Sequence, residues 1–140
     1  MVLTRDADVA FGFAFAHAED DYKTIEETAL AVRGKLGAVK GTEAAVTDYI
    51  VALMGVWNTI DTRYDKDLTP ELRRVLDAYA DGVNYYGALH PDKVTAGLLP
   101  LTGRDVAAGF IFKTPFFYGF DKTLMALFKA KKGSLSKDGK

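Results

Sequence analysis

The chain has 140 residues, a formal net charge of −1 and a hydrophobic content of 49%. This length and composition suit one domain with a true hydrophobic core. A net charge so close to zero argues against a chain whose main task is binding nucleic acid, so no nucleic-acid partner is expected. The chain has no cysteine, which excludes disulfides, thiolate metal sites and cysteine nucleophiles.

Neither a membrane span nor a signal peptide is expected in this chain. No stretch reaches the roughly 18 apolar residues that a bilayer crossing requires. The opening segment, MVLTRDADV, carries two acids and lacks the apolar run of a signal peptide.

The first predicted helix dominates the N-terminal quarter of the chain. Residues 1–8 form a polar lead-in with weak strand character at 2–4, and the helix follows from about Ala10 to Val32. Apolar side chains recur in steps of four and three, which places them on one stripe: Phe11, Phe15, Ala18, Tyr22, Ile25, Ala29 and Val32. The opposite face carries the polar residues Glu19, Asp20, Lys23, Glu26, Glu27 and Arg33. Such a stripe must pack on a large apolar surface.

The middle of the chain predicts two further helices. Three glycines indicate a loop over 34–41. A second helix is expected over 42–60, with a broad apolar face formed by Val46, Tyr49, Ile50, Leu53, Met54, Trp57 and Ile60. A polar connection over 61–68 leads to Thr69-Pro70-Glu71, which has a hydroxyl cap, a proline and an acid in the order of a helix start. The third helix then buries Leu72, Val75, Leu76, Tyr79, Val83 and Tyr86, and Gly87 is expected to close it.

Two shorter helices are expected after a loop over 88–103. Thr102 or Asp105 is expected to cap a helix over 106–113, and Pro115 to break it. A fifth helix is expected over 117–132, with its inward face formed by Leu124, Leu127 and Phe128.

The predicted fold class is therefore mainly α, with about five helices. Residues 1–132 form one helical domain, and 133–140 form a tail or the start of a linker.

The chain is poor in catalytic groups. Its two serines, Ser134 and Ser136, lie in the predicted tail, so a Ser–His–Asp arrangement is not expected. His17 and His90 lie in unrelated segments without a ligand-spaced partner. We interpret His17 as a helix residue bonded to a neighbouring polar group, and His90 as a loop residue.

Aromatic residues are concentrated between positions 110 and 128: Phe110, Phe112, Phe116, Phe117, Tyr118, Phe120 and Phe128. Aromatics at helical spacing usually belong to a core. Those around a proline-broken helix are hard to bury in one small chain, so some should face a partner or line an apolar pocket.

The segment AFGFAFAHAEDD, followed by TIEETALAVRG, resembles the opening of the α chain in the penicillin acylase family of N-terminal-nucleophile hydrolases. It is most similar to the branch of acyl-homoserine lactone acylases and aculeacin A acylase. The matching residues of this first segment are Gly12, Phe13, Ala16, Ala18, Glu19, Asp20, Arg33 and Gly34. A second segment, 76–84, resembles the family's Tyr-Ala-x-Gly-hydrophobic-Asn pattern, and Asp105-Val106 is the third match. Together the three cover about residues 8–128.

The resemblance implies a heterodimer of αββα architecture cut from one precursor. In that family the catalytic serine is the first residue of the β chain, and its α-amino group is the general base. No catalytic residue is therefore expected in this chain. The family's Gly-x-Pro-His strand has no counterpart before the first match, which indicates a truncated or unusual start. A periplasmic or secreted location is also implied.

The resemblance places the substrate-binding turn by its distance from Asp105-Val106. The turn falls at about 113–118, and the expected substrate-binding residues are Thr114, Phe116, Phe117 and Tyr118. The implied substrate is a small-molecule acyl amide. Some family members bind calcium through an acid beyond this helix. The aligned position here is near Leu124, where Asp121 is the only acid, so no metal and no cofactor are expected.

The leading hypothesis is therefore an α subunit, or a fragment of one, from an amide hydrolase that releases an acyl group. One alternative is a stand-alone helical module that binds a lipid-like or aromatic ligand. Another is a non-catalytic structural domain, which would leave the three ordered matches unexplained.

Overall fold

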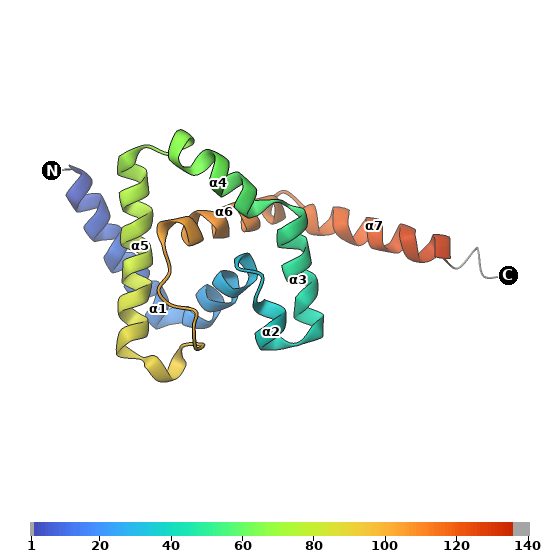
Figure 1. The fold of residues 1–140 in the computed structure, drawn as a ribbon, viewed down its shortest axis with the longest axis horizontal. Helices are drawn as coiled ribbons and strands as arrows, with labels where there is room; N and C mark the ends of the chain where they lie inside the picture. Colours follow the sequence, from blue (N-terminus) through green and yellow to red (C-terminus); the bar gives the residue numbers. More distant parts are fainter. Residues whose placement is uncertain (1, 136–140) are drawn as a thin grey trace.

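The computed structural model describes residues 2–135 and shows a mainly α fold, as the sequence predicts (Figure 1). No strand occurs within that range. The elements are α1 (Val2–Val32), α2 (Leu36–Lys40), α3 (Thr42–Leu53), α4 (Val56–Asp67), α5 (Pro70–Leu89), the 3-10 helix η1 (Pro91–Lys93), α6 (Gly103–Phe117) and α7 (Phe120–Leu135). None of these helices combines the length and apolarity that a bilayer crossing requires.

Helix α1 starts earlier than predicted and is kinked. It begins at Val2, so the expected lead-in with strand character is wrong; the segment contains no glycine or proline that would stop the helix. At Asp21 the backbone leaves helical geometry, with φ −152° and ψ 63°. The Asp21 carboxylate accepts a hydrogen bond from the Thr24 amide at 3.2 Å, which caps the second half of the helix.

The apolar stripe of α1 packs on α5, which crosses it closely (Figure 1). The predicted stripe is confirmed, because all seven of its side chains are buried or half-buried. The large apolar surface that the stripe requires lies within this chain, since α5 covers the stripe. Gly82 permits the approach: a Cβ there would lie 2.4 Å from the Phe11 carbonyl oxygen and 2.9 Å from the Ala14 Cβ.

The predicted second helix is two helices that meet at Gly55. Gly55 has a left-handed backbone, with φ 64°, and separates α3 from α4. Helix α4 continues to Asp67, so the expected polar connection over 61–68 is wrong. Ile60 and Tyr64, four residues apart, bury one face of this polar segment. Three members of the predicted apolar face are exposed instead: Val46, Tyr49 and Leu53.

The expected loop over 34–41 contains the short helix α2. The Asp48 carboxylate accepts hydrogen bonds from the Leu36 amide at 3.0 Å and the Gly37 amide at 2.8 Å. This side chain from α3 satisfies the free amides at the start of α2.

Helix α5 begins as predicted and ends later than predicted. The Thr69 hydroxyl accepts a hydrogen bond from the Leu72 amide at 3.2 Å, which confirms the cap. Gly87 does not close the helix, because it is buried inside it: a Cβ there would lie 2.2 Å from Leu99 Cδ1. Leu72, predicted to be buried, is exposed.

Helix α6 runs through Pro115 to Phe117, so the predicted break at the proline is wrong. Pro115 lies in the last turn, where the lost amide costs the helix a single backbone bond. The break comes at Gly119, with φ 81°, before α7. Helix α7 extends away from the other helices (Figure 1), and Leu127 is exposed rather than inward-facing. The side chain of Phe128 and residues 136–140 lie outside the described part of the chain.

Candidate functional site

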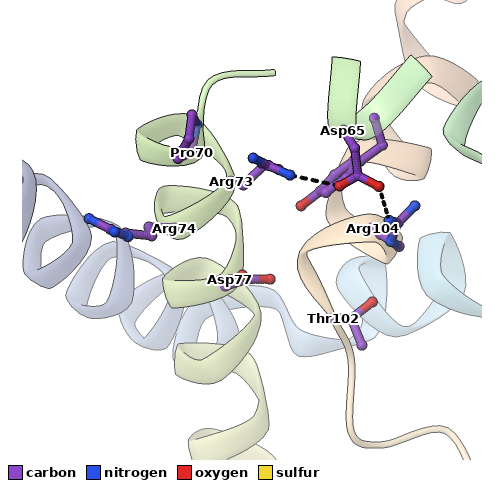
Figure 2. A pocket seen from close by; sticks show the side chains of 8 residues that line it. Asp65, Pro70, Arg73, Arg74, Asp77, Thr102 and Arg104 are labelled. Carbon is purple, nitrogen blue, oxygen red and sulfur yellow. Dashed lines mark hydrogen bonds and ion pairs between the residues drawn. The ribbon is translucent and has the colours of Figure 1, made fainter. Parts of the chain in front are cut away.

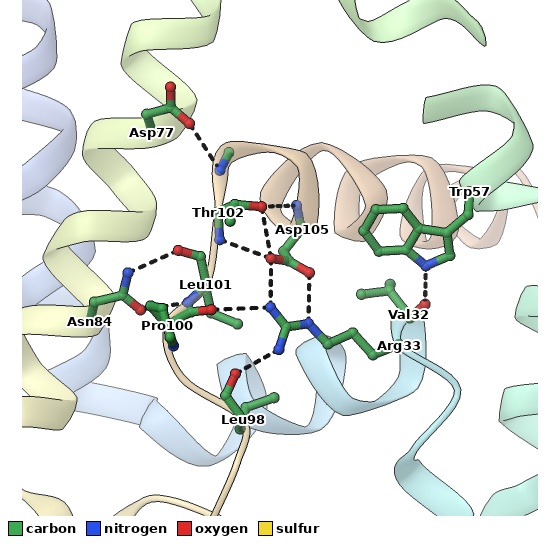
Figure 3. Close-up of polar contacts among 11 residues, drawn as sticks. Val32, Arg33, Trp57, Asp77, Asn84, Leu98, Pro100, Leu101, Thr102 and Asp105 are labelled. Carbon is green, nitrogen blue, oxygen red and sulfur yellow. Dashed lines mark hydrogen bonds and ion pairs between the residues drawn. The ribbon is translucent and has the colours of Figure 1, made fainter. Parts of the chain in front are cut away.

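The three segments that resemble one family converge on the stretch 98–105 before and into α6 (Figure 3). Arg33, at the end of α1, donates two hydrogen bonds to Asp105, from Nε to Oδ1 and from Nη2 to Oδ2, both at 2.8 Å. It also donates to the Leu98 carbonyl at 2.6 Å and to the Pro100 carbonyl at 3.2 Å. One guanidinium thus joins the end of α1, the loop that leads into α6, and α6 itself.

Asp105 is the buried acid of this arrangement, with 6% of its surface exposed. It accepts hydrogen bonds from the Thr102 amide at 2.8 Å and the Thr102 hydroxyl at 2.9 Å. The two residues expected as alternative caps thus act together in a capping box. Burial alone would raise the pKa of Asp105. The hydrogen bonds from Arg33 and Thr102 outweigh burial and hold this pKa below its usual range.

Helix α5 holds the same stretch from the other side. The Asn84 side chain donates to the Leu101 carbonyl at 2.9 Å and accepts from the Leu101 amide at 2.7 Å. The Asp77 carboxylate accepts from the Gly103 amide at 3.0 Å. Gly103 must be small, because a Cβ would lie 2.4 Å from Asp77 Oδ1. The approach to α6 is therefore fixed by both α1 and α5.

The aromatic groove, formed by Phe112, Lys113, Phe116 and Phe117, lies two turns further along α6 and has a volume of about 400 Å³. Phe116 is held edge-on between Phe112, at 5.4 Å between ring centroids, and Phe120, at 5.6 Å. Phe117 extends outward, with 88% of its surface exposed. The groove is open and apolar, and it can accommodate an alkyl chain or an aryl group.

The structure brings together two of the four residues predicted to bind substrate. Phe116 and Phe117 line the groove, whereas Thr114 and Tyr118 do not. The Thr114 hydroxyl donates to the Phe110 carbonyl at 2.6 Å, and Tyr118 is 86% exposed. Their role in binding stays a prediction. Phe112 lines the groove although the resemblance did not single it out; its place four residues before Phe116 on one helix could have indicated it.

The histidines and the buried tyrosines do not form a catalytic arrangement. His17 Nδ1 lies 2.9 Å from the Tyr79 hydroxyl, which confirms the predicted polar neighbour. The His90 ring stacks on Tyr86 at 4.2 Å. Burial raises the pKa of Tyr22 to about 12, so its hydroxyl keeps its proton near neutral pH. No cluster of three potential metal ligands occurs within the described residues.

A second pocket, of about 470 Å³, lies between the ends of α4, α5 and α6 (Figure 2). Arg73 and Arg104 both bond to Asp65, at 2.7 and 2.8 Å, whereas Arg74 points away from them. Arg74 and Asp77 also line the pocket, so three arginines lie there with two acids. Because two of the three arginines are already paired with Asp65, we interpret the pocket mainly as an ion-pair network.

The fold and its contacts define a helical scaffold that holds an apolar groove on one helix. The chain belongs to the penicillin amidase family, whose family model matches residues 4–124.

Two curated relatives are acyl-homoserine lactone acylases named QuiP. The protein from Pseudomonas putida is 31% identical over 91 residues, which cover 65% of this chain and 11% of that protein. The protein from Pseudomonas fluorescens is 28% identical over 110 residues, which cover 75% of this chain and 14% of that protein. The chain therefore matches only a small part of the length of these relatives.

Proposed function

We propose that this chain is the α subunit, or a fragment of the α subunit, of an amidohydrolase that cleaves a linear amide and releases its acyl group. The proposal is supported by the family match over residues 4–124 and by relatives named as acyl-homoserine lactone acylases. Acyl-homoserine lactones, penicillins and lipopeptides are the substrate types considered.

The observation that carries the proposal is the aromatic groove on α6. Phe112 and Phe116 form a fixed wall, and the exposed ring of Phe117 extends from its edge. Burying an acyl chain against such a wall contributes roughly 0.8 kcal/mol per CH₂. In this proposal Thr114 and Tyr118 contact the substrate after further protein has closed the open side of the groove.

The nucleophile is proposed to come from a partner. The resemblance implies a β chain of the same precursor, whose first residue is a catalytic serine with a free α-amino group as general base. This agrees with a chain whose serines, Ser134 and Ser136, lie beyond the aromatic segment. A periplasmic or secreted location belongs to the same proposal.

The test is to express the reading frame of this chain together with any continuation beyond Lys140. We expect a second chain to copurify, with serine as its N-terminal residue by sequencing. The purified complex should release free fatty acid from acyl-homoserine lactones or amine from acyl anilides. If the product is a single chain that binds alkyl compounds without cleaving them, the stand-alone binding module is correct instead.

A further inference from the structure

We propose that Arg33 and Asp105 are positioning residues that determine which acyl chain the aromatic groove accepts. The inference rests on the proposed function and assigns a role to a pair that touches no part of the groove. The pair instead fixes the start of the helix that carries the groove residues.

Contacts of Arg33 and Asp105 restrain the start of α6. Asp105 lies in its first turn, and the hydrogen bonds of Arg33 tie that turn to the end of α1 and to the carbonyls of Leu98 and Pro100. The end of α1 is itself held, since the Trp57 ring nitrogen donates to the Val32 carbonyl (Figure 3). The start of α6 is therefore tied to a point that α4 also fixes.

The groove lies at the opposite end of α6 from this restraint. Phe116 lies about three helical turns beyond Asp105, or about 16 Å along the axis. A tilt of about 5° at the start of α6 would shift the Phe116 ring by about 1.4 Å, close to one carbon–carbon bond length. Because all the residues that line the groove lie on α6, such a shift would move the whole groove by about one carbon of an acyl chain relative to the protein that is proposed to close its open side.

A buried bidentate ion pair fixes the geometry of the groups it joins more than it stabilises the fold. Taking both charges out of water costs about as much as their attraction returns, so a buried pair is a poor source of net stability. Its bidentate geometry, however, permits little variation in distance or angle. Lysine in place of Arg33 would keep the charge and lose the second hydrogen bond.

The test uses the intact protein and its R33K and D105N variants, with V83A as the matched control. Val83 is fully buried between α1 and α5, so V83A destabilises the fold without touching the pair. The readout is kcat/KM for the p-nitroanilides of hexanoic, octanoic and decanoic acids. We expect the ratio between the best and the next-best chain to fall about 5-fold in R33K and D105N. In V83A that ratio should change by less than about 2-fold.

Hydrogen exchange gives a second readout that does not depend on activity. Amides of α6 should exchange faster in R33K and D105N, whereas amides of α5 should keep their wild-type rates. If the wild type cleaves the anilides but the ratio stays unchanged in both variants, the positioning role is refuted and the proposed function stands. If the wild type cleaves neither these anilides nor any acyl amide of the substrate types considered above, the proposed function fails. In that case hydrogen exchange still tests whether the ion pair restrains α6. Unchanged exchange rates of the α6 amides in both variants would refute that restraint as well.

Discussion

Arg33 and Asp105 lie 72 positions apart in the sequence and form a bidentate ion pair that joins the end of α1 to the start of α6. The two residues belong to the first and the third of the segments that resemble the penicillin acylase family. Asn84 and Asp77, from the second segment, bind the loop and helix start beside the pair. The resemblance between sequences thus corresponds to one connected set of contacts in the structure.

Removing one partner of the pair should be costly. In D105A the guanidinium of Arg33 loses both charged hydrogen bonds while it stays largely covered, so the free energy of unfolding should fall by about 3 kcal/mol. Urea denaturation at pH 7 measures this. The control is R63A, because Arg63 pairs with Asp67 at an exposed site and its removal should cost less than about 1 kcal/mol. Equal losses in the two variants would contradict a special role for the buried pair.

The stability that Asp105 supplies should depend on pH in one direction. Its pKa is lower in the folded chain than in the unfolded chain, so the unfolded state takes up its proton first as pH falls. The contribution is present above the unfolded value of about 3.9 and is lost as pH falls from there toward the folded value. The melting temperatures of wild type and D105N should therefore differ at pH 7 and converge below about pH 4. The exposed acids are shared by both proteins and cancel in this difference. A constant difference from pH 7 to pH 3 would contradict the charged state assigned to Asp105.

Two glycine substitutions test the packing of α1 on α5. G82A places a Cβ against the Phe11 carbonyl and Ala14, and it should lower the free energy of unfolding by about 2 kcal/mol despite the better helix propensity of alanine. G12A is the matched control, because no atom lies within 4 Å of a Cβ at that position. It should stabilise the protein by about 0.5 to 1 kcal/mol. Denaturant unfolding measures both changes. A gain in stability in G82A as large as that in G12A would contradict close packing of α1 on α5.

The sequence predicts a helix well where the capping residue or the apolar stripe lies within that helix. Thr69 caps α5 within its own turn, Thr102 and Asp105 cap α6 in the same way, and the stripe of α1 follows from its spacing. These local signals are sufficient to predict the mainly α fold class. The local sequence does not show whether a glycine ends a helix or lies buried inside one. Gly55 ends a helix with a left-handed backbone, whereas Gly87 lies inside α5 against Leu99.

Contacts between distant segments could not be predicted from spacing. Asp48 caps α2 from the following helix, and α1 finds its partner in α5. The charge of Arg33 predicts only a position on the polar face of α1, whereas its partner is the acid of a helix 72 residues further along the chain. The concentration of aromatic residues is evident from the sequence. The groove, however, depends on which rings face one side of α6, and therefore on the helix continuing through Pro115, where local propensity predicts a break.

The most direct test of the account is the dependence of amide hydrolysis on the Phe116 side chain. This chain, together with the β chain proposed above, is assayed against acyl-homoserine lactones of increasing chain length, as wild type, F116A and the control L89A. Leu89 is exposed at the end of α5 and does not line the groove. The account predicts hydrolysis by the wild type, a loss of about 10-fold in kcat/KM for the preferred chain in F116A, and little change in L89A. Wild-type hydrolysis with the same chain-length profile in F116A would contradict the role of the groove, and no hydrolysis of any acyl amide would contradict the proposed function.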